Sequence, residues 1–115
     1  MYIQSSLIYW AQVSAAGALT LQNGPGLLTI GLAASVYTIT MPANFTVPRN
    51  RRFIGLTGNT AAGAANQRVC NYDEAASTDA TVVVTASDLA VPGAANCAFQ
   101  LCVYRVQFQI GNGVG

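Results

Sequence analysis

The sequence has no histidine and no lysine, and it has few charged residues of any kind. Its 115 residues include five arginines and four carboxylates, so that 8% are charged and the formal net charge is +1. A typical soluble domain has about 25%. Without histidine the chain lacks Ser/His and Cys/His nucleophile pairs, imidazole metal ligands and a base that titrates near neutral pH. We therefore expect a protein that is not an enzyme, has no catalytic residues and takes no cofactor.

The four carboxylates do not form a recognisable site either. Asp73, Glu74, Asp79 and Asp88 lie in or beside expected loops, whereas a glycosidase needs a carboxylate pair that faces a cleft. Segment 73–79 lacks the alternating oxygen ligands and the glycine of an EF-hand loop. The glycine-containing loop 58–66 has no following Lys-Ser/Thr pair and so is not a phosphate loop. We expect no metal site and no small-molecule substrate.

A long hydrophobic run is also absent. Polar residues and glycines interrupt every apolar run well before the ~20 residues that a membrane-spanning helix requires. The apolar run LIYWA near the N-terminus has no basic leading region and is shorter than the core of a signal peptide, so we expect an unprocessed chain with no membrane partner. The small net charge, without an extended patch of basic and aromatic residues, argues against a nucleic-acid partner.

Cysteine is scarce, odd in number and not arranged in a CxxC motif. Cys97 and Cys102 are five residues apart, which in one strand places them on opposite faces about 16 Å from each other, too far for a disulfide. Cys70 could pair with either. Since nothing indicates an oxidising compartment, we expect buried free thiols.

What the sequence does contain is a succession of short segments rich in Val, Ile, Thr, Tyr and Phe, separated by Gly, Pro and Asn clusters. This pattern predicts an all-β fold: one antiparallel β-sandwich or jelly-roll-like domain of about eight strands over residues 1–115. The turn residues of segment 22–27, QNGPGL, predict a tight hairpin. The acidic connection 73–80 has room for a short helical turn, and Pro92-Gly93 predicts a chain reversal. The expected strands are 5–13, 18–22, 27–31, 35–41, 52–58, 67–72, 81–87 and 97–110.

The last of these strands is apolar on both faces. One face carries Cys97, Phe99, Leu101 and Val103, and the other carries Cys102, Tyr104, Val106, Phe108 and Ile110. A domain of this size has one core and can bury only one such face. Either the strand bulges near Val103–Tyr104 and returns to its own core, or another subunit covers the second face. We favour a self-associating subunit, because the exposed patch would exceed what monomers usually tolerate.

The first strand is also apolar on both faces, and its Tyr9 or Trp10 is either an interface anchor or a core residue, with the core favoured for Trp10. The candidate subunit interface therefore consists of Tyr104, Val106, Phe108, Ile110 and Tyr9. The densest charge in the chain is the arginine run Arg49, Arg51 and Arg52. This run is either a solvated loop or a contact with carboxylates or phosphate on a partner.

Three segments carry a family resemblance: SVYTITMPANFTVPRNRRFIGLTG, VCNYDEAASTDATVVVTASDLAVPGAA and CAFQLCVYRVQF. Their layout, over roughly residues 35 to 110, resembles the small β-sandwich domains of bacteriophage virion surfaces, found in capsid-decorating (cement) proteins and tail-fibre knobs. The closing strand is also distantly similar to the trimeric jelly rolls of the tumour-necrosis-factor and C1q class.

The resemblance implies a homotrimer on a virion surface whose partner is the major capsid protein. Because the chain begins at Met1 and is almost entirely one domain, we expect a free-standing cement subunit, with Arg49, Arg51 and Arg52 as the capsid contact. The alternative is a receptor- or glycan-binding knob of a tail fibre or head spike, which would bind through loops 59–66 and 87–96.

Overall fold

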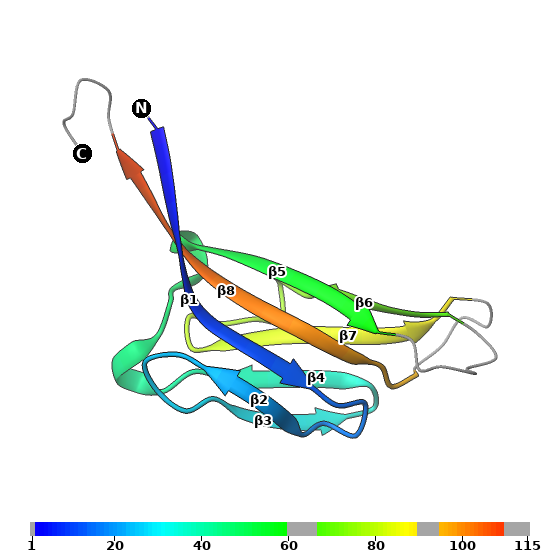
Figure 1. The fold of residues 1–115 in the computed structure, drawn as a ribbon. Coiled ribbons are helices and arrows are strands. Elements are labelled where there is room, and N and C mark those ends of the chain that lie inside the picture. Colours follow the sequence, from blue (N-terminus) through cyan, green and yellow to red (C-terminus); the bar gives the residue numbers. More distant parts are fainter. Residues whose placement is uncertain (1, 60–66, 90–94, 110–115) are drawn as a thin grey trace.

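The computed structural model describes residues 2–59, 67–89 and 95–109, and these form two packed β-sheets (Figure 1). All pairings are antiparallel, so the predicted all-β sandwich of about eight strands is confirmed. The strands are β1 (Tyr2–Val13), β2 (Leu19–Asn23), β3 (Thr29–Ala33), β4 (Val36–Thr40), β5 (Arg52–Asn59), β6 (Arg68–Tyr72), β7 (Thr81–Asp88) and β8 (Ala98–Gln109).

Two four-stranded sheets make up the sandwich. The first sheet has the order β2-β1-β8-β5 and the second has the order β3-β4-β7-β6. Hairpins β1–β2, β3–β4 and β6–β7 stay within one sheet, while the other connections cross between the two. Two short 3-10 helices, η1 (Ala43–Phe45) and η2 (Arg49–Arg51), lie on the crossing from β4 to β5. Among the described residues, no helix has the length and apolarity to cross a membrane.

The core lies between the two sheets and follows from strand alternation. In β8 the alternate residues Phe99, Leu101 and Val103 point inward, and each is at most 1% exposed. The Phe99 ring meets Tyr37 of the opposite sheet edge-on, with ring centroids 5.1 Å apart. Further core residues come from β1, β4 and β7 and from the loops that cross between the sheets: Tyr9, Ala11, Val13, Leu28, Ile39, Met41, Val47, Val82, Val84, Ala86 and Cys97.

The predicted hairpin at 22–27 is wrong. Strands β2 and β3 flank this segment but belong to different sheets, so the chain crosses the sandwich here. Gly24 permits the crossing because its backbone lies against the buried Tyr9 ring, and a Cβ at that position would be 2.4 Å from Tyr9 Cδ1. The Gln22 side chain then accepts a 2.8 Å hydrogen bond from the Leu28 amide. The turn residues of this segment therefore let the chain pass closely from one sheet to the other.

The acidic connection before β7 is a hydrogen-bonded turn and not a helix. The Asp73 carboxylate accepts a hydrogen bond from the Ala76 amide, 3.1 Å. The Ser77 hydroxyl donates to the Asp73 carbonyl and accepts from the Val83 amide, so Ser77 is buried. The reversal expected at Pro92-Gly93 lies outside the described residues.

Candidate interaction surface

A bulge in β1 determines which side chains reach the outer face of the first sheet. Leu7 lies opposite Tyr104 and Tyr9 lies opposite Val103, so Ile8 is an extra residue between them. The sequence allowed a bulge in the last strand near Val103–Tyr104. The structure instead has the bulge in β1, opposite these two residues. Because β8 itself stays regular, Tyr104 and Val106 remain on the outer face. The alternative in which β8 turns back into its own core is therefore wrong for these two residues.

The outer face of the first sheet is uncharged and carries large apolar side chains together with the polar residues Ser5, Gln12, Asn23, Thr57 and Gln100. Arg52 and Arg105 are the charged residues of its four strands, and they lie opposite each other in the register, on the other face of the sheet. Ile3, Leu7, Leu21 and Phe53 are 52% to 61% exposed. Trp10, Tyr104 and Val106 are half-buried between them. We refer to the side chains of Ile3, Leu7, Trp10, Leu21, Phe53, Tyr104 and Val106 as the outer apolar face.

The outer face of the second sheet has a different composition. The registers of β3, β4, β6 and β7 place hydroxyl and amide side chains there, with glycine and a few small apolar residues. This is the usual solvated face of a sandwich. The polar members are Thr29, Thr38, Thr40, Asn71, Thr81, Thr85 and Ser87. Among the described strands, the aromatic and leucine or isoleucine side chains that face outward therefore lie on the first sheet, while the second sheet exposes valines such as Val36.

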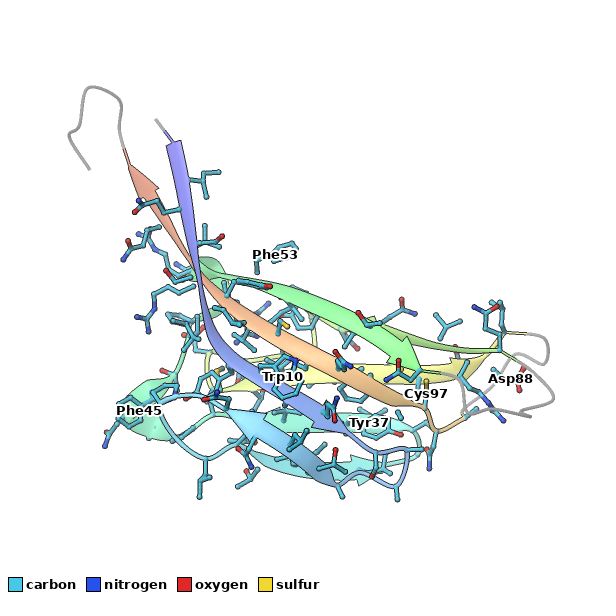
Figure 2. The ribbon with its side chains drawn as sticks, viewed as in Figure 1. Trp10, Tyr37, Phe45, Phe53, Asp88 and Cys97 are labelled. Atoms are coloured by element: carbon cyan, nitrogen blue, oxygen red, sulfur yellow. The ribbon has the colours of Figure 1, made fainter. Side chains whose placement is uncertain are left out.

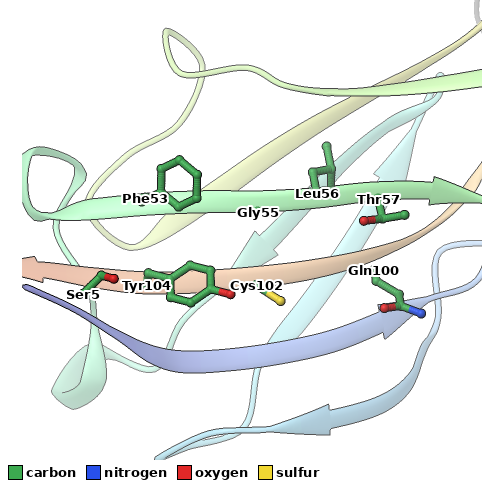
Figure 3. A pocket seen from close by; sticks show the side chains of 8 residues that line it. All are labelled: Ser5, Phe53, Gly55, Leu56, Thr57, Gln100, Cys102 and Tyr104. Carbon is green, nitrogen blue, oxygen red and sulfur yellow. The ribbon is translucent and has the colours of Figure 1, made fainter.

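A shallow hollow lies on the outer face of the first sheet, over β8 and the edge strand β5 (Figure 3). It has a volume of about 310 Å³, and its floor is formed by Gly55 and Cys102, which lie opposite each other in β5 and β8. Phe53 and Tyr104 form its edge, with ring centroids 5.8 Å apart. The remaining lining residues are Ser5, Leu56, Thr57 and Gln100. Because glycine leaves a gap beside two aromatic rings, the hollow can accept a side chain from another molecule.

The paired ends of β1 and β8 project beyond the sandwich (Figure 1). β5 pairs with β8 only as far as Arg105, and β2 pairs with β1 only over Trp10–Val13. Residues 2–5 and 106–109 therefore form a two-stranded ribbon. Among the described residues, the two strands of this ribbon pair only with each other. The ribbon contributes to a molecule measuring 54 × 26 × 24 Å. Two strands alone are marginally stable in water, so this ribbon is suited to packing on a neighbour.

The structure separates the predicted interface residues into three groups. Tyr104 and Val106 lie on the outer face, half-buried. The side chain of Phe108 and the whole of Ile110 lie outside what the structure describes. The prediction of Tyr9 as an interface residue is wrong. Tyr9 is 1% exposed, its hydroxyl donates a 2.7 Å hydrogen bond to the Phe45 carbonyl, and burial raises its pKa. It is a core residue and is not available to a partner.

The assignment of Trp10 to the core is also wrong, because the residue lies on the outer face. Figure 2 labels it on β1, together with the outward-facing Phe53. The first strand is apolar on both faces, so its alternation does not reveal which face is buried, and the extra residue at Ile8 places Leu7 and Tyr9 on opposite faces. Phe53 was missed, although it alternates with Ile54 and so belongs to the face opposite the core.

The arginine run is largely used within the chain. The Arg52 guanidinium donates to the carbonyls of Val47, Thr78 and Thr81 and to the Tyr72 hydroxyl, at 2.9 to 3.1 Å. It is therefore a structural residue, which corrects its prediction as a capsid contact. Arg49 and Arg51 remain exposed.

The acidic turn lies against this arginine run. Arg49 pairs with Glu74 at 3.0 Å, and the Arg49 amide bonds the Asp79 carboxylate. Hydrogen bonds from the Tyr72 hydroxyl and from Arg49 hold the pKa of Glu74 below its ordinary value. Two of the four carboxylates, Glu74 and Asp79, thus serve as partners for Arg49.

Comparison of the chain with family models, with curated proteins and with solved structures gave no match. The loops proposed for a receptor- or glycan-binding knob fall largely on residues 60–66 and 90–94, outside the described residues.

Proposed function

We propose that this protein is a structural virion protein: a capsid-decorating (cement) subunit that self-associates as a homotrimer and stabilises the major capsid lattice of a bacteriophage. Its work is binding at the virion surface, without catalysis or a cofactor. The observation that carries the proposal is the outer apolar face of the first sheet, which is uncharged and continues into the projecting ribbon.

The first support is the composition of that face. Exposed apolar side chains that lie together mark an interaction surface more strongly than the same side chains scattered singly. Phe53, Tyr104 and Trp10 are aromatic residues of the type that carries much of the binding energy at protein interfaces. Arg52 and Arg105 do not lie on this face, so no charge has to lose its hydration when a second copy covers it.

The second support is the geometry of the ribbon. β1 runs toward the sandwich and β8 runs away from it, paired antiparallel. Around a three-fold axis parallel to the ribbon, the outer edge of β1 in one copy would meet the outer edge of β8 in the next, again antiparallel. Three ribbons would close into six strands with no open edge. A closed heterologous ring of this kind satisfies the backbone groups that an isolated ribbon leaves to water.

Cementing would follow from binding alone. A trimer that spans neighbouring capsid subunits adds buried area at their junctions, and anything that binds the assembled lattice better than its separated parts stabilises the lattice by mass action. Arg49 and Arg51 lie in the exposed η2 turn. They are the remaining candidates for a contact with acidic residues of the capsid.

The test uses two charge insertions at matched positions. Phe53 and Thr29 are both exposed on edge strands, but Phe53 lies on the outer apolar face and Thr29 on the polar outer face of the second sheet. We expect light scattering to give a trimer for the wild-type protein and for Thr29→Glu. We expect a monomer for Phe53→Glu, with the same circular dichroism as the wild type.

The same proteins are then added to phage particles that were assembled without this chain, and the temperature of particle rupture is measured. The wild-type protein and Thr29→Glu should raise that temperature, while Phe53→Glu should have a clearly smaller effect. A monomeric wild-type protein would contradict self-association. A rupture temperature that the wild-type protein leaves unchanged, combined with binding to host polysaccharide on a glycan array, would favour the receptor-binding knob.

A further inference from the structure

Two of the three cysteines lie at the same end of the sandwich on opposite sheets. Cys70 is in β6 of the second sheet, and Cys97 directly precedes β8 of the first sheet. The Gly58–Asn59 end of β5 lies beside both. A Cβ on Gly58 would be 3.6 Å from Cys70 Sγ, and the Cys97 thiol is 3.4 Å from the Asn59 carbonyl oxygen. The end of β5 thus lies between the two cysteines.

Both thiols therefore lie beside the same two residues at the end of β5. Burial, followed by the interaction with the Cys97 thiol, raises the pKa of Cys70 to about 12. Cys97 is 2% exposed, and its backbone amide donates a 3.1 Å hydrogen bond to the Tyr37 hydroxyl, which holds it in place. Cys102 instead lines the hollow on the outer face.

We propose that Cys70 and Cys97 form an oxidation site, in which a disulfide joins the two sheets while Cys102 remains a thiol. With oxidised glutathione as the oxidant, one cysteine thiolate attacks a glutathione sulfur and releases one reduced glutathione. The other cysteine then attacks the mixed disulfide and releases the second. Two thiols lose two electrons and two protons, and one oxidised glutathione becomes two reduced molecules. This inference does not depend on the proposed function.

The bond would close a loop of about 28 residues that contains β7 and the two connections beside it, and restricting such a loop in the unfolded chain stabilises the folded state. The Cys70 pKa keeps its thiolate scarce in the folded protein near neutral pH, and the thiolate is the reacting form. Oxidation is therefore expected to be faster in the unfolded chain than in the folded one. The experiment accordingly refolds the protein from urea in a buffer that contains reduced and oxidised glutathione.

The expected product has lost two hydrogen atoms from its mass, and one cysteine remains reactive to an alkylating reagent. Trypsin leaves all three cysteines on one peptide, because no arginine or lysine lies between Arg68 and Arg105. Cleavage at the acidic residues separates Cys70 from the other two, and chymotrypsin then separates Cys97 from Cys102. We expect a Cys70–Cys97 linked peptide and an alkylated Cys102.

The matched control is Cys102→Ser, which should give the same linked peptide, whereas Cys97→Ala should give none. The oxidised wild-type protein should unfold at a temperature higher by roughly 10 °C, and reductant should remove the difference. Three results would each overturn the inference. They are alkylation of both Cys70 and Cys97 after oxidation, a link from Cys70 to Cys102, and an unfolding temperature that does not depend on the redox state.

Discussion

At the scale of single residues, Arg52 shows how one charged side chain connects separate parts of the sandwich. It begins β5 in the first sheet, yet it also donates hydrogen bonds to Tyr72, Thr78 and Thr81, which belong to the turn and strands of the second sheet. Its guanidinium also lies 5.8 Å from the centre of the Tyr72 ring. Hydrogen bonds from a charged donor contribute more to stability than neutral ones, and their loss leaves carbonyls without a partner.

We expect Arg52→Ala to lower the free energy of unfolding by about 2 to 3 kcal/mol, measured by urea denaturation. The control is Arg49→Ala in the neighbouring turn. Its ion pair with Glu74 is 40% and 53% exposed, and an exposed pair contributes at most about 1 kcal/mol. Equal losses in the two variants would show that Arg52 contributes no more than a surface charge.

At the scale of elements, the crossing from β2 to β3 depends on contact between a glycine and a buried ring. Gly24 lies against Tyr9, which the core and a hydrogen bond to the Phe45 carbonyl hold in place. The ring therefore cannot move aside to admit a methyl group. Gly31 in β3 is the natural comparison, because nothing lies within 4 Å of the Cβ that it lacks.

Gly24→Ala should therefore lower the free energy of unfolding by about 1 to 3 kcal/mol, as overpacking usually does. Gly31→Ala should stay within about 0.5 kcal/mol of the wild type. Thermal or urea unfolding of the two variants side by side measures the difference. If Gly24→Ala were as stable as Gly31→Ala, the crossing would not depend on close packing at Tyr9.

The same elements show how far the sequence predicts this structure. All eight strands were predicted, most within one or two residues of their bounds, because alternation is a local property of the chain. The first strand is longer than expected, and the sheet in which β2 or β3 would lie was not predictable from turn residues alone. The Ile8 bulge and the partners of Arg52 depend on packing between distant segments. Because the first strand is apolar on both faces, Tyr9 and Trp10 were assigned to the wrong faces, whereas Tyr104 and Val106 lie on the outer face of regular β8 as predicted.

At the scale of the whole molecule, most charged groups lie away from the outer apolar face, and the exposed Arg105 is the one that adjoins Leu7 among the described residues. Arg49 pairs with Glu74, Arg68 pairs with Asp88 at 3.3 Å, and Arg52 bonds carbonyls within the sandwich. The outer apolar face and the ribbon contain none of these groups. Under the proposed function, copies would therefore meet through apolar contacts and strand edges, while attachment to the capsid would rely on the exposed arginines of the η2 turn.

These two kinds of contact should respond differently to salt. Raising NaCl from about 0.1 M to about 1 M shortens the screening length from about 10 Å to about 3 Å, which weakens exposed ion pairs but not the burial of apolar surface. The trimer should therefore persist in light scattering at the higher concentration, whereas co-sedimentation of the protein with capsids should decrease. Substituting both Arg49 and Arg51 with Gln should weaken co-sedimentation at low salt without changing the trimer. A trimer that dissociates in salt would show that charged groups, and not the outer apolar face, hold the copies together.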